Sequence, residues 1–298
     1  MLAGYVLLYT ATLLAMVRFG QFKAVEALGV FVVLGVGFSL LAALLTMGVK
    51  PLMYEVREPA RELAYLLIYL LPLAALVAYG FDAVHRFVLT QPAASLAILA
   101  VKLVIFVIVP GWLIATRFGY KISQLAPVGL PTSHLLGFFG IAIALLVFQA
   151  LAGRGLRDIS AADIPSEKLL FGMPFVFLWL MLEVGIVEEF FFRVLLQSRL
   201  SAALRSELGG IVLMALLFGL VHAPGLYLRT NITQEGLSTH PSLWMAIGYS
   251  IVITSVAGFF LGALWARTRN FLLLVMVHAA ADLLPNTLPT LQAFHVLK

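Results

Sequence analysis

Nine stretches of the chain are apolar over a length that reaches, or nearly reaches, the thickness of a lipid bilayer. A helix needs about 20 predominantly apolar residues to cross the hydrocarbon core. Because no water solvates the backbone there, the spanning segments must be helices unless they form a closed barrel, and they lack the alternation of barrel strands. Helices are therefore expected, the first and third of them short, at residues 2–17, 27–49, 63–79, 94–115, 134–152, 170–192, 208–222, 243–266 and 271–289.

The composition supports the same class of protein. Hydrophobic residues make up 62% of the 298 residues and charged residues 11%, whereas soluble domains contain about 45–50% apolar and about 25% charged residues. The sequence predicts an all-α, polytopic membrane helix bundle of eight or nine transmembrane helices, with the lipid bilayer as its main partner.

Charge and cysteine content exclude several other functions. The net charge of +5 comes from Lys and Arg residues scattered singly through short connections, so no basic face for nucleic acid is predicted. The chain contains no cysteine, which excludes disulfides, thiolate metal ligands and a cysteine nucleophile. The charges of the connections differ too little between the two sides to predict the orientation in the membrane.

Ionisable side chains inside the predicted spans are the strongest indication of function. Such a group costs about 2.5–3.5 kcal/mol at the centre of a bilayer, so it normally faces a cavity or a partner. Lys102 lies close enough to a span end that we expect it to snorkel toward the headgroups. The groups inside the apolar runs are Glu183, Glu188, Glu189, Asp282, His222 and His278, together with Lys102.

The first motif is the run VEEFFFR at residues 187–193. Glu189 and Arg193 are four residues apart and share one helix face, so the arginine can neutralise that carboxylate. Glu188 is turned by about 100° from Glu189, which leaves it able to point toward a separate centre. Gly185 leaves room for another helix or a substrate backbone. The alternative interpretation is an ion pair that serves only topology or helix packing.

The second motif is LLFGLVHAPG, in which Phe218 and His222 are four residues apart. Pro224 and Gly225 are expected to end this helix, which would place the histidine where water can reach it. A histidine in such a position is suited to proton transfer. A buried histidine that is simply hydrogen-bonded within the core is the alternative.

The third motif is LLLVMVHAAADLLPN, in which His278 and Asp282 are again four residues apart. The carboxylate can orient or charge the imidazole, and the three alanines between the two residues would let another element approach. Each motif alone is weak, but three spans that carry ionisable groups in an otherwise uncharged bundle can compensate one another.

Taken in order, these three motifs resemble the CPBP intramembrane protease family. That family contains the CAAX prenyl endopeptidases and bacterial bacteriocin-processing and abortive-infection-like proteins. The resemblance covers roughly residues 170–285, so the chain is divided here into N-terminal transmembrane helices of unassigned function (1–165) and a CPBP-like catalytic membrane core (166–298). Both parts are expected to form one continuous bundle.

The resemblance implies a glutamate-type intramembrane endopeptidase without a cofactor, in the plasma (inner) membrane of a prokaryote. Its substrate would be a peptide or membrane-protein segment, with or without a prenyl group. By position, the resemblance assigns Glu188 as the general base, His222 as its assistant, His278 and Asp282 to the oxyanion side, and Glu189 with Arg193 as support.

One position departs from the pattern of the family's prenyl endopeptidases, which frequently have asparagine where this chain has Asp282. An ionised carboxylate cannot donate a hydrogen bond to an oxyanion. We therefore expect Asp282 to orient His278.

Three other functions use the same residues. A zinc protease could bind the metal through Glu188, His222 and His278, although no His-Glu-x-x-His sequence is present. A proton-coupled transporter could use the carboxylates as a relay, but no inverted repeat is evident. A non-catalytic scaffold or immunity protein could retain the fold and bind peptides or partner proteins.

Overall fold

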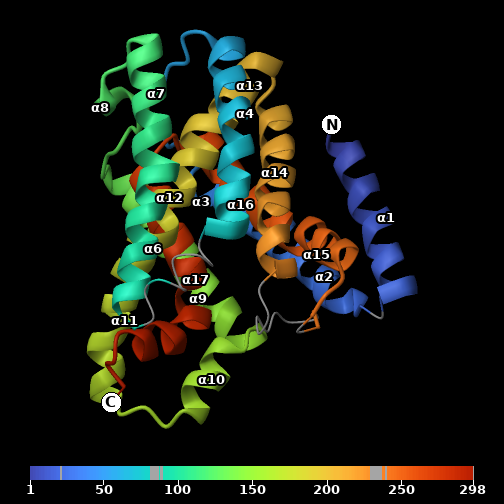
Figure 1. Ribbon diagram of the computed structural model, residues 1–298, viewed down its shortest axis with the longest axis vertical. Helices are drawn as coiled ribbons and strands as arrows, with labels where there is room; N and C mark the ends of the chain where they lie inside the picture. Colours follow the sequence, from blue (N-terminus) through green and yellow to red (C-terminus); the bar gives the residue numbers. More distant parts are fainter. Residues whose placement is uncertain (21, 81–86, 88–89, 229–236, 239, 298) are drawn as a thin grey trace. The chain divides into compact units, whose positions relative to one another are not determined.

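Helices account for every regular element in the part of the chain that the computed structural model describes, and no strand occurs in that part. The described residues are 1–20, 22–80, 87, 90–228, 237–238 and 240–297. The predicted all-α fold is therefore confirmed (Figure 1).

Eight helical segments of the described chain are long and apolar enough to cross a membrane, which confirms the prediction of eight or nine. The first four comprise α1 (Leu2–Gly20), α2 (Ala24–Val30) with η1 (Phe31–Phe38) and α3 (Ser39–Leu45), α6 (Ala93–Leu103) with η3 (Val104–Ile108) and α7 (Val109–Phe118), and α9 (Thr132–Ala152).

The other four spans lie in the C-terminal half of the chain. They comprise α11 (Ser166–Leu180) with η4 (Met181–Ile186), α12 (Val187–Glu189), η5 (Phe190–Gln197) and α13 (Ser198–Leu204); α14 (Glu207–Leu228); α15 (Leu243–Tyr249) with η6 (Ser250–Thr254) and α16 (Ser255–Thr268); and α17 (Phe271–Ala293).

The remaining helical elements are shorter or lie outside those eight spans. The stretch predicted at 63–79 is helical, but it is not one of the eight. These elements are α4 (Pro59–Ala75) with η2 (Leu76–Gly80), α8 (Ile122–Leu125) and α10 (Gly155–Ala161).

The chain forms two compact units, each assembled from separate parts of the sequence. Unit 1 comprises residues 1–44, 55–80 and 192–267, and unit 2 comprises residues 45–54, 81–191 and 268–298. The predicted boundary between 1–165 and 166–298 concerns function and stays a prediction.

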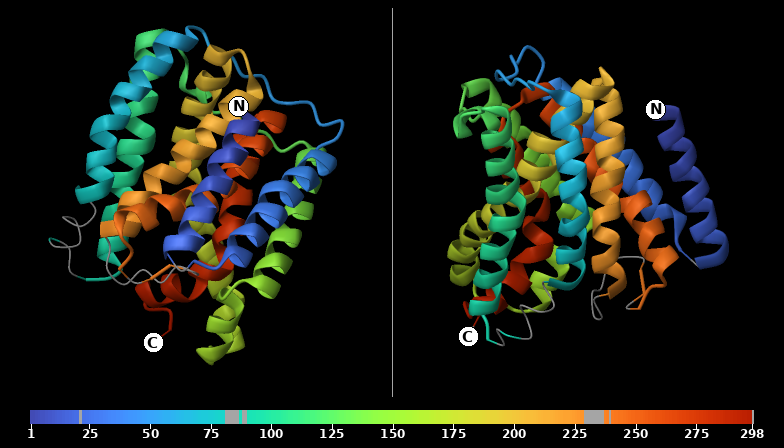
Figure 2. Two further views of the ribbon diagram at one scale, coloured as in Figure 1. Left: turned by 90° about the vertical axis from the view of Figure 1, so that its right-hand side faces the viewer. Right: turned by 45° about the horizontal axis from the view of Figure 1, so that its top comes forward.

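Unit 2 is organised around α17, which packs against α9, α10, α11 and η4; α9 and α17 lie side by side (Figure 2). Its apolar cluster has Val176, Leu180, Ala279, Leu283 and Leu291 at its centre. Small residues let the backbones approach, as is common between membrane helices.

Unit 1 contains α14 packed against α13, α15 and η6. Gly219 and Gly258 provide the close approaches, because a Cβ at Gly258 would lie 3.1 Å from the Cα of Ala215. A second apolar cluster joins α1 to α15 and η6 through Tyr9, Met16 and Tyr249, among others.

Two predicted helix ends are wrong. The span predicted at 170–192 continues to Leu204, because Arg193, Gln197 and Arg199, which resemble loop residues in the sequence, are fully buried. The helix expected to end at Pro224 continues to Leu228, since neighbouring groups can satisfy the backbone that a proline frees in a membrane helix.

Candidate functional site

The two adjacent glutamates lie in α12, a single α-helical turn between the π-helical segments η4 and η5. Glu189 is fully buried, whereas Glu188 is partly exposed. This difference agrees with the prediction that the two carboxylates point in different directions.

Gly185 sets the distance between this segment and α17. A Cβ at Gly185 would lie 2.9 Å from the carbonyl oxygen of Val275, which is closer than non-bonded carbon and oxygen atoms pack. The space left by this glycine is thus occupied by another helix, one of the two possibilities derived from the sequence. The contact brings His278, three residues after Val275, to the level of α12.

The imidazole of His278 lies between two carboxylates. Its Nδ1 is 2.6 Å from Oε1 of Glu189, and its Nε2 is 3.7 Å from Oδ2 of Asp282. Because an ionised carboxylate can only accept, Nδ1 carries the hydrogen toward Glu189. The side chain of His278 is 8% exposed and that of Asp282 is 35% exposed, so Asp282 lies on the more open side of this group of residues.

The histidine of the second motif lies in unit 1. His222 Nδ1 is 2.7 Å from the carbonyl oxygen of Phe218, so Nδ1 carries the hydrogen and Nε2 of a neutral ring is left to accept a proton. The Phe218 ring lies 4.8 Å from the His222 ring between centroids. The guanidinium carbon of Arg193 is 4.0 Å from the centroid of the same phenylalanine, within the range of a cation–π interaction.

The predicted site residues are divided between the two units. Glu188, Glu189, His278 and Asp282 belong to unit 2, and the structure brings the last three together. Arg193 and His222 belong to unit 1, where Phe218 lies between them. The expected Glu189–Arg193 pair and the convergence of Glu188, His222 and His278 therefore stay predictions.

A metal site would need several His, Asp or Glu side chains close to one point. Among the described residues, no group of three or more His, Asp and Glu side chains is close enough to hold a metal ion. The zinc set of Glu188, His222 and His278 draws on both units.

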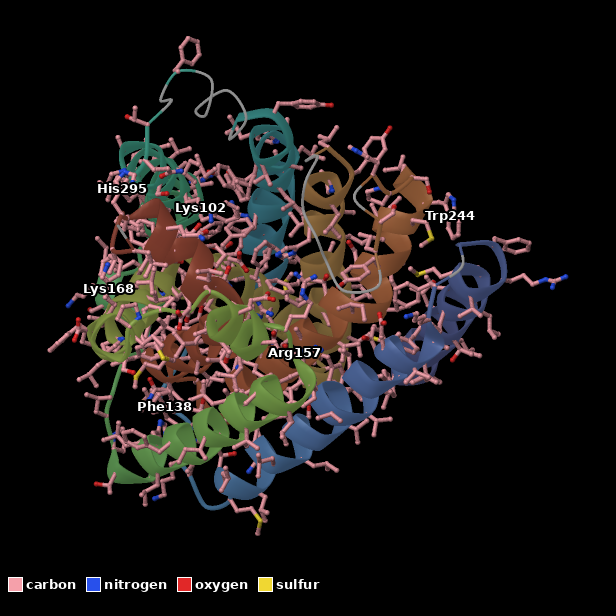
Figure 3. All side chains as sticks on the ribbon, turned by 90° about the horizontal axis from the view of Figure 1, so that it is seen from below. Lys102, Phe138, Arg157, Lys168, Trp244 and His295 are labelled. Carbon is pink, nitrogen blue, oxygen red and sulfur yellow. The ribbon has the colours of Figure 1, made fainter. Side chains whose placement is uncertain are left out.

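Lys102 does not snorkel as the sequence predicted. Its ammonium group forms an ion pair with the carboxylate of Glu183 within unit 2 and lies 3.4 Å from the carbonyl oxygen of the same residue. Lys102 is labelled in Figure 3. The two side chains are 17% and 22% exposed. Glu183, for which the sequence predicted no role, is thus the partner of Lys102.

A fully buried ion pair was not predicted from the sequence. Glu62 and Arg199 fall in predicted connections, yet both side chains are 0% exposed and Nε of Arg199 is 2.8 Å from Oε2 of Glu62. One signal was available, because the apolar residues Leu195, Leu196 and Leu200 continue past the predicted end of the span. Their burial carries the helix onward and places Arg199 inside unit 1.

A comparison with protein families identifies the segment that carries all three motifs. Residues 170–284 match the family model described as type II CAAX prenyl endopeptidase Rce1-like. Searches of the curated proteins and of the solved structures found no match.

The match, the helical fold and the eight apolar spans define a multi-pass integral membrane protein with an intramembrane CAAX-type protease segment. The match confirms the resemblance predicted for roughly residues 170–285.

Proposed function

We propose that the chain is a glutamate-dependent intramembrane endopeptidase in which Glu188 activates the attacking water. The substrate is a membrane-associated peptide, and the reaction requires no metal. The location is the plasma membrane of a prokaryote, as for the bacterial members of the family that the motifs resemble.

The observation that supports this function best is the contact between Glu189 and His278. A carboxylate that is 0% exposed is costly unless it is hydrogen-bonded, and the 2.6 Å contact compensates it. The same contact fixes the ring, in the way that a carboxylate orients the histidine of a hydrolase. Glu189 therefore takes the orienting role that the sequence had suggested for Asp282, which lies farther from the ring at 3.7 Å.

The proposed chemistry divides the remaining tasks among these residues. Glu188, which is partly exposed, takes a proton from a water molecule while the oxygen of that water bonds to the scissile carbonyl carbon. The developing oxyanion needs a preorganised donor, and Nε2 of His278 provides one when it is protonated. The carbon–nitrogen bond then breaks, and the leaving amine receives the proton that Glu188 took from the water.

The substrate is proposed on the same basis. Among the site residues of unit 2, Glu188 and Asp282 are partly exposed, so the scissile bond is expected to approach from their side. A prenyl group would anchor a peptide in the bilayer, although an unmodified membrane-protein segment would also be held there.

Cleavage of peptide libraries in liposomes tests the proposal. One library carries a prenylated cysteine near the C-terminus, and a second has the same sequences without the prenyl group. We expect Glu188→Ala to lower kcat by about 10²–10⁴-fold, the usual contribution of a general base. Glu167→Ala is the matched control, because Glu167 is an exposed acid in the first turn of α11 and its loss should leave kcat unchanged.

The mechanism would be overturned by equal cleavage with wild type and Glu188→Ala. Exhaustive chelation of the same samples separates the zinc alternative. Retained activity agrees with the proposal, whereas loss of activity that zinc restores would identify a metalloprotease.

A further inference from the structure

Gln149 is a buried amide in a helix that lies outside the segment matched by the family model. It belongs to α9, which is otherwise apolar over most of its length, and it is 8% exposed. An amide placed in such an environment costs free energy unless its donor and its acceptor are both hydrogen-bonded. Its partners therefore show what the side chain stabilises.

Both partners of Gln149 are backbone groups of α17. Its Nε2 donates to the carbonyl oxygen of Ala280 over 2.9 Å, and its Oε1 accepts from the amide of Leu284 over 3.2 Å. In a regular helix these two backbone groups are partners of each other, four residues apart. The glutamine thus supplies one donor and one acceptor to a single turn of the neighbouring helix.

That turn of α17 needs support because of the proline that follows it. Pro285 has no N–H for the carbonyl of Ala281, and its ring crowds that carbonyl. The side chain of Asn286 donates to the carbonyl oxygen of Asp282 over 2.9 Å. Polar side chains therefore replace part of the regular hydrogen bonding, as is typical where membrane helices contain proline.

The supported turn is also the turn that carries the histidine motif. Ala280 lies midway between His278 and Asp282, so a rotation of the backbone at Ala280 changes the direction of one side chain relative to the other. The small Ala279 and Ala280 side chains are almost fully buried. The predicted close approach at these alanines is therefore made, at least in part, by α9.

We propose that Gln149 is a positioning residue of the peptidase, which holds the Ala280–Leu284 turn so that His278 stays in contact with Glu189 and Asp282 stays beside the ring. This inference rests on the proposed function. It also gives a role to part of the chain before residue 166, for which the sequence suggested none.

Kinetics of two Gln149 variants test the proposal in the full-length protein in liposomes. Gln149→Leu keeps the approximate volume and removes both hydrogen bonds. We expect kcat to fall by about 10–100-fold, because a misplacement of about 1 Å at a catalytic group can cost that much, while KM changes by less than about threefold.

Gln149→Glu provides a readout that a purely structural role would not give. A carboxylate can accept from Leu284 but cannot donate to Ala280, whereas the protonated acid can do both. The ratio of variant to wild-type kcat is therefore expected to rise as the pH falls. A ratio that is independent of pH would overturn the proposal.

Thr287→Val is the matched control on the same helix. Thr287 is fully buried, and its hydroxyl donates to the carbonyl oxygen of Leu283 over 2.8 Å within α17. Its replacement removes a buried hydrogen bond within α17 but keeps the hydrogen bonds between Gln149 of α9 and the backbone of α17. We expect kcat within about threefold of wild type, and a loss equal to that of Gln149→Leu would show that any weakening of α17 has the same effect.

A measurement without substrate separates this inference from the proposed function. The imidazole ¹⁵N signals of His278 report its hydrogen bond to Glu189 and can be assigned by their absence in His278→Gln. We expect them to shift in Gln149→Leu and to stay in place in Thr287→Val. Unchanged signals in Gln149→Leu overturn the positioning role whether or not any peptide is cleaved. If the signals shift in Gln149→Leu but the wild-type protein cleaves no peptide, the proposed function alone is refuted.

Discussion

Replacement of either member of the buried Glu62–Arg199 pair should lower the stability of unit 1 more than any exposed charge could. Both side chains are 0% exposed. Oε1 of Glu62 accepts from the backbone amides of Arg57 and Glu58 over 3.1 and 2.8 Å at the start of α4. Arg199 donates further to the carbonyl oxygen of Val194 over 2.9 Å.

The expected magnitude follows from these contacts. Removal of one partner of a buried ion pair costs about 3–5 kcal/mol, because the other charge is left uncompensated. Arg199→Leu should lie at the lower end, since Glu62 keeps its two backbone donors. Glu62→Leu should lie at the upper end, because it also removes the carboxylate that accepts from those two backbone amides at the start of α4. At about 2–4 °C per kcal/mol for chains of 150–250 residues, the melting temperature should fall by roughly 6–20 °C.

Thermal unfolding in detergent measures these shifts, and a double-mutant cycle isolates the coupling. The matched control is the exposed pair of Glu58 and Arg61, whose side chains are 45% and 61% exposed and which should contribute about 1 kcal/mol or less. The double variant of Glu62 and Arg199 should be more stable than the sum of the single losses predicts. Shifts below 2 °C in both single variants, or strict additivity, would refute the reasoning.

Two further predictions concern the surroundings of the site. Gly185→Ala should lower the stability by about 1–3 kcal/mol through overpacking and should also lower kcat, because the new Cβ would collide with the backbone of Val275. A variant with the melting temperature and kcat of the wild type would contradict the close approach. Phe218→Leu removes the ring beneath Arg193 and should cost about 0.5–2 kcal/mol. Thermal unfolding checks this loss, and Phe218→Tyr, which keeps an aromatic face, should retain most of the stability.

The sequence was sufficient to predict the class of fold because burial in lipid restricts the backbone so strongly. The length of the apolar stretches was enough to predict all eight spans. Proline and charged residues predicted the ends of the helices less well. Arg199 was treated as a connection residue, since nothing in a local window of the sequence shows that its charge will have a buried partner. For Arg199 that partner is Glu62, 137 positions away.

The site was predicted less completely than the fold. Spacing of four residues correctly identified His278 and Asp282 as neighbours. It could not show that His278 would donate its short hydrogen bond to Glu189, because that contact depends on the approach of α17 to η4 at Gly185. The contacts of Gln149 with α17 could likewise not be predicted from the sequence, since a single amide in an apolar span has no periodic pattern.

The ion pair of Lys102 and Glu183 has a consequence for the synthesis of the protein. The lysine is made 81 residues before its partner, which corresponds to roughly 4–16 s at about 5–20 residues per second. During that interval the ammonium group has no carboxylate at its final position, so we expect it to reach for the headgroups by extending its own stem. The snorkelling predicted from the sequence would then describe the growing chain, and the arrival of Glu183 would draw the lysine into its final place.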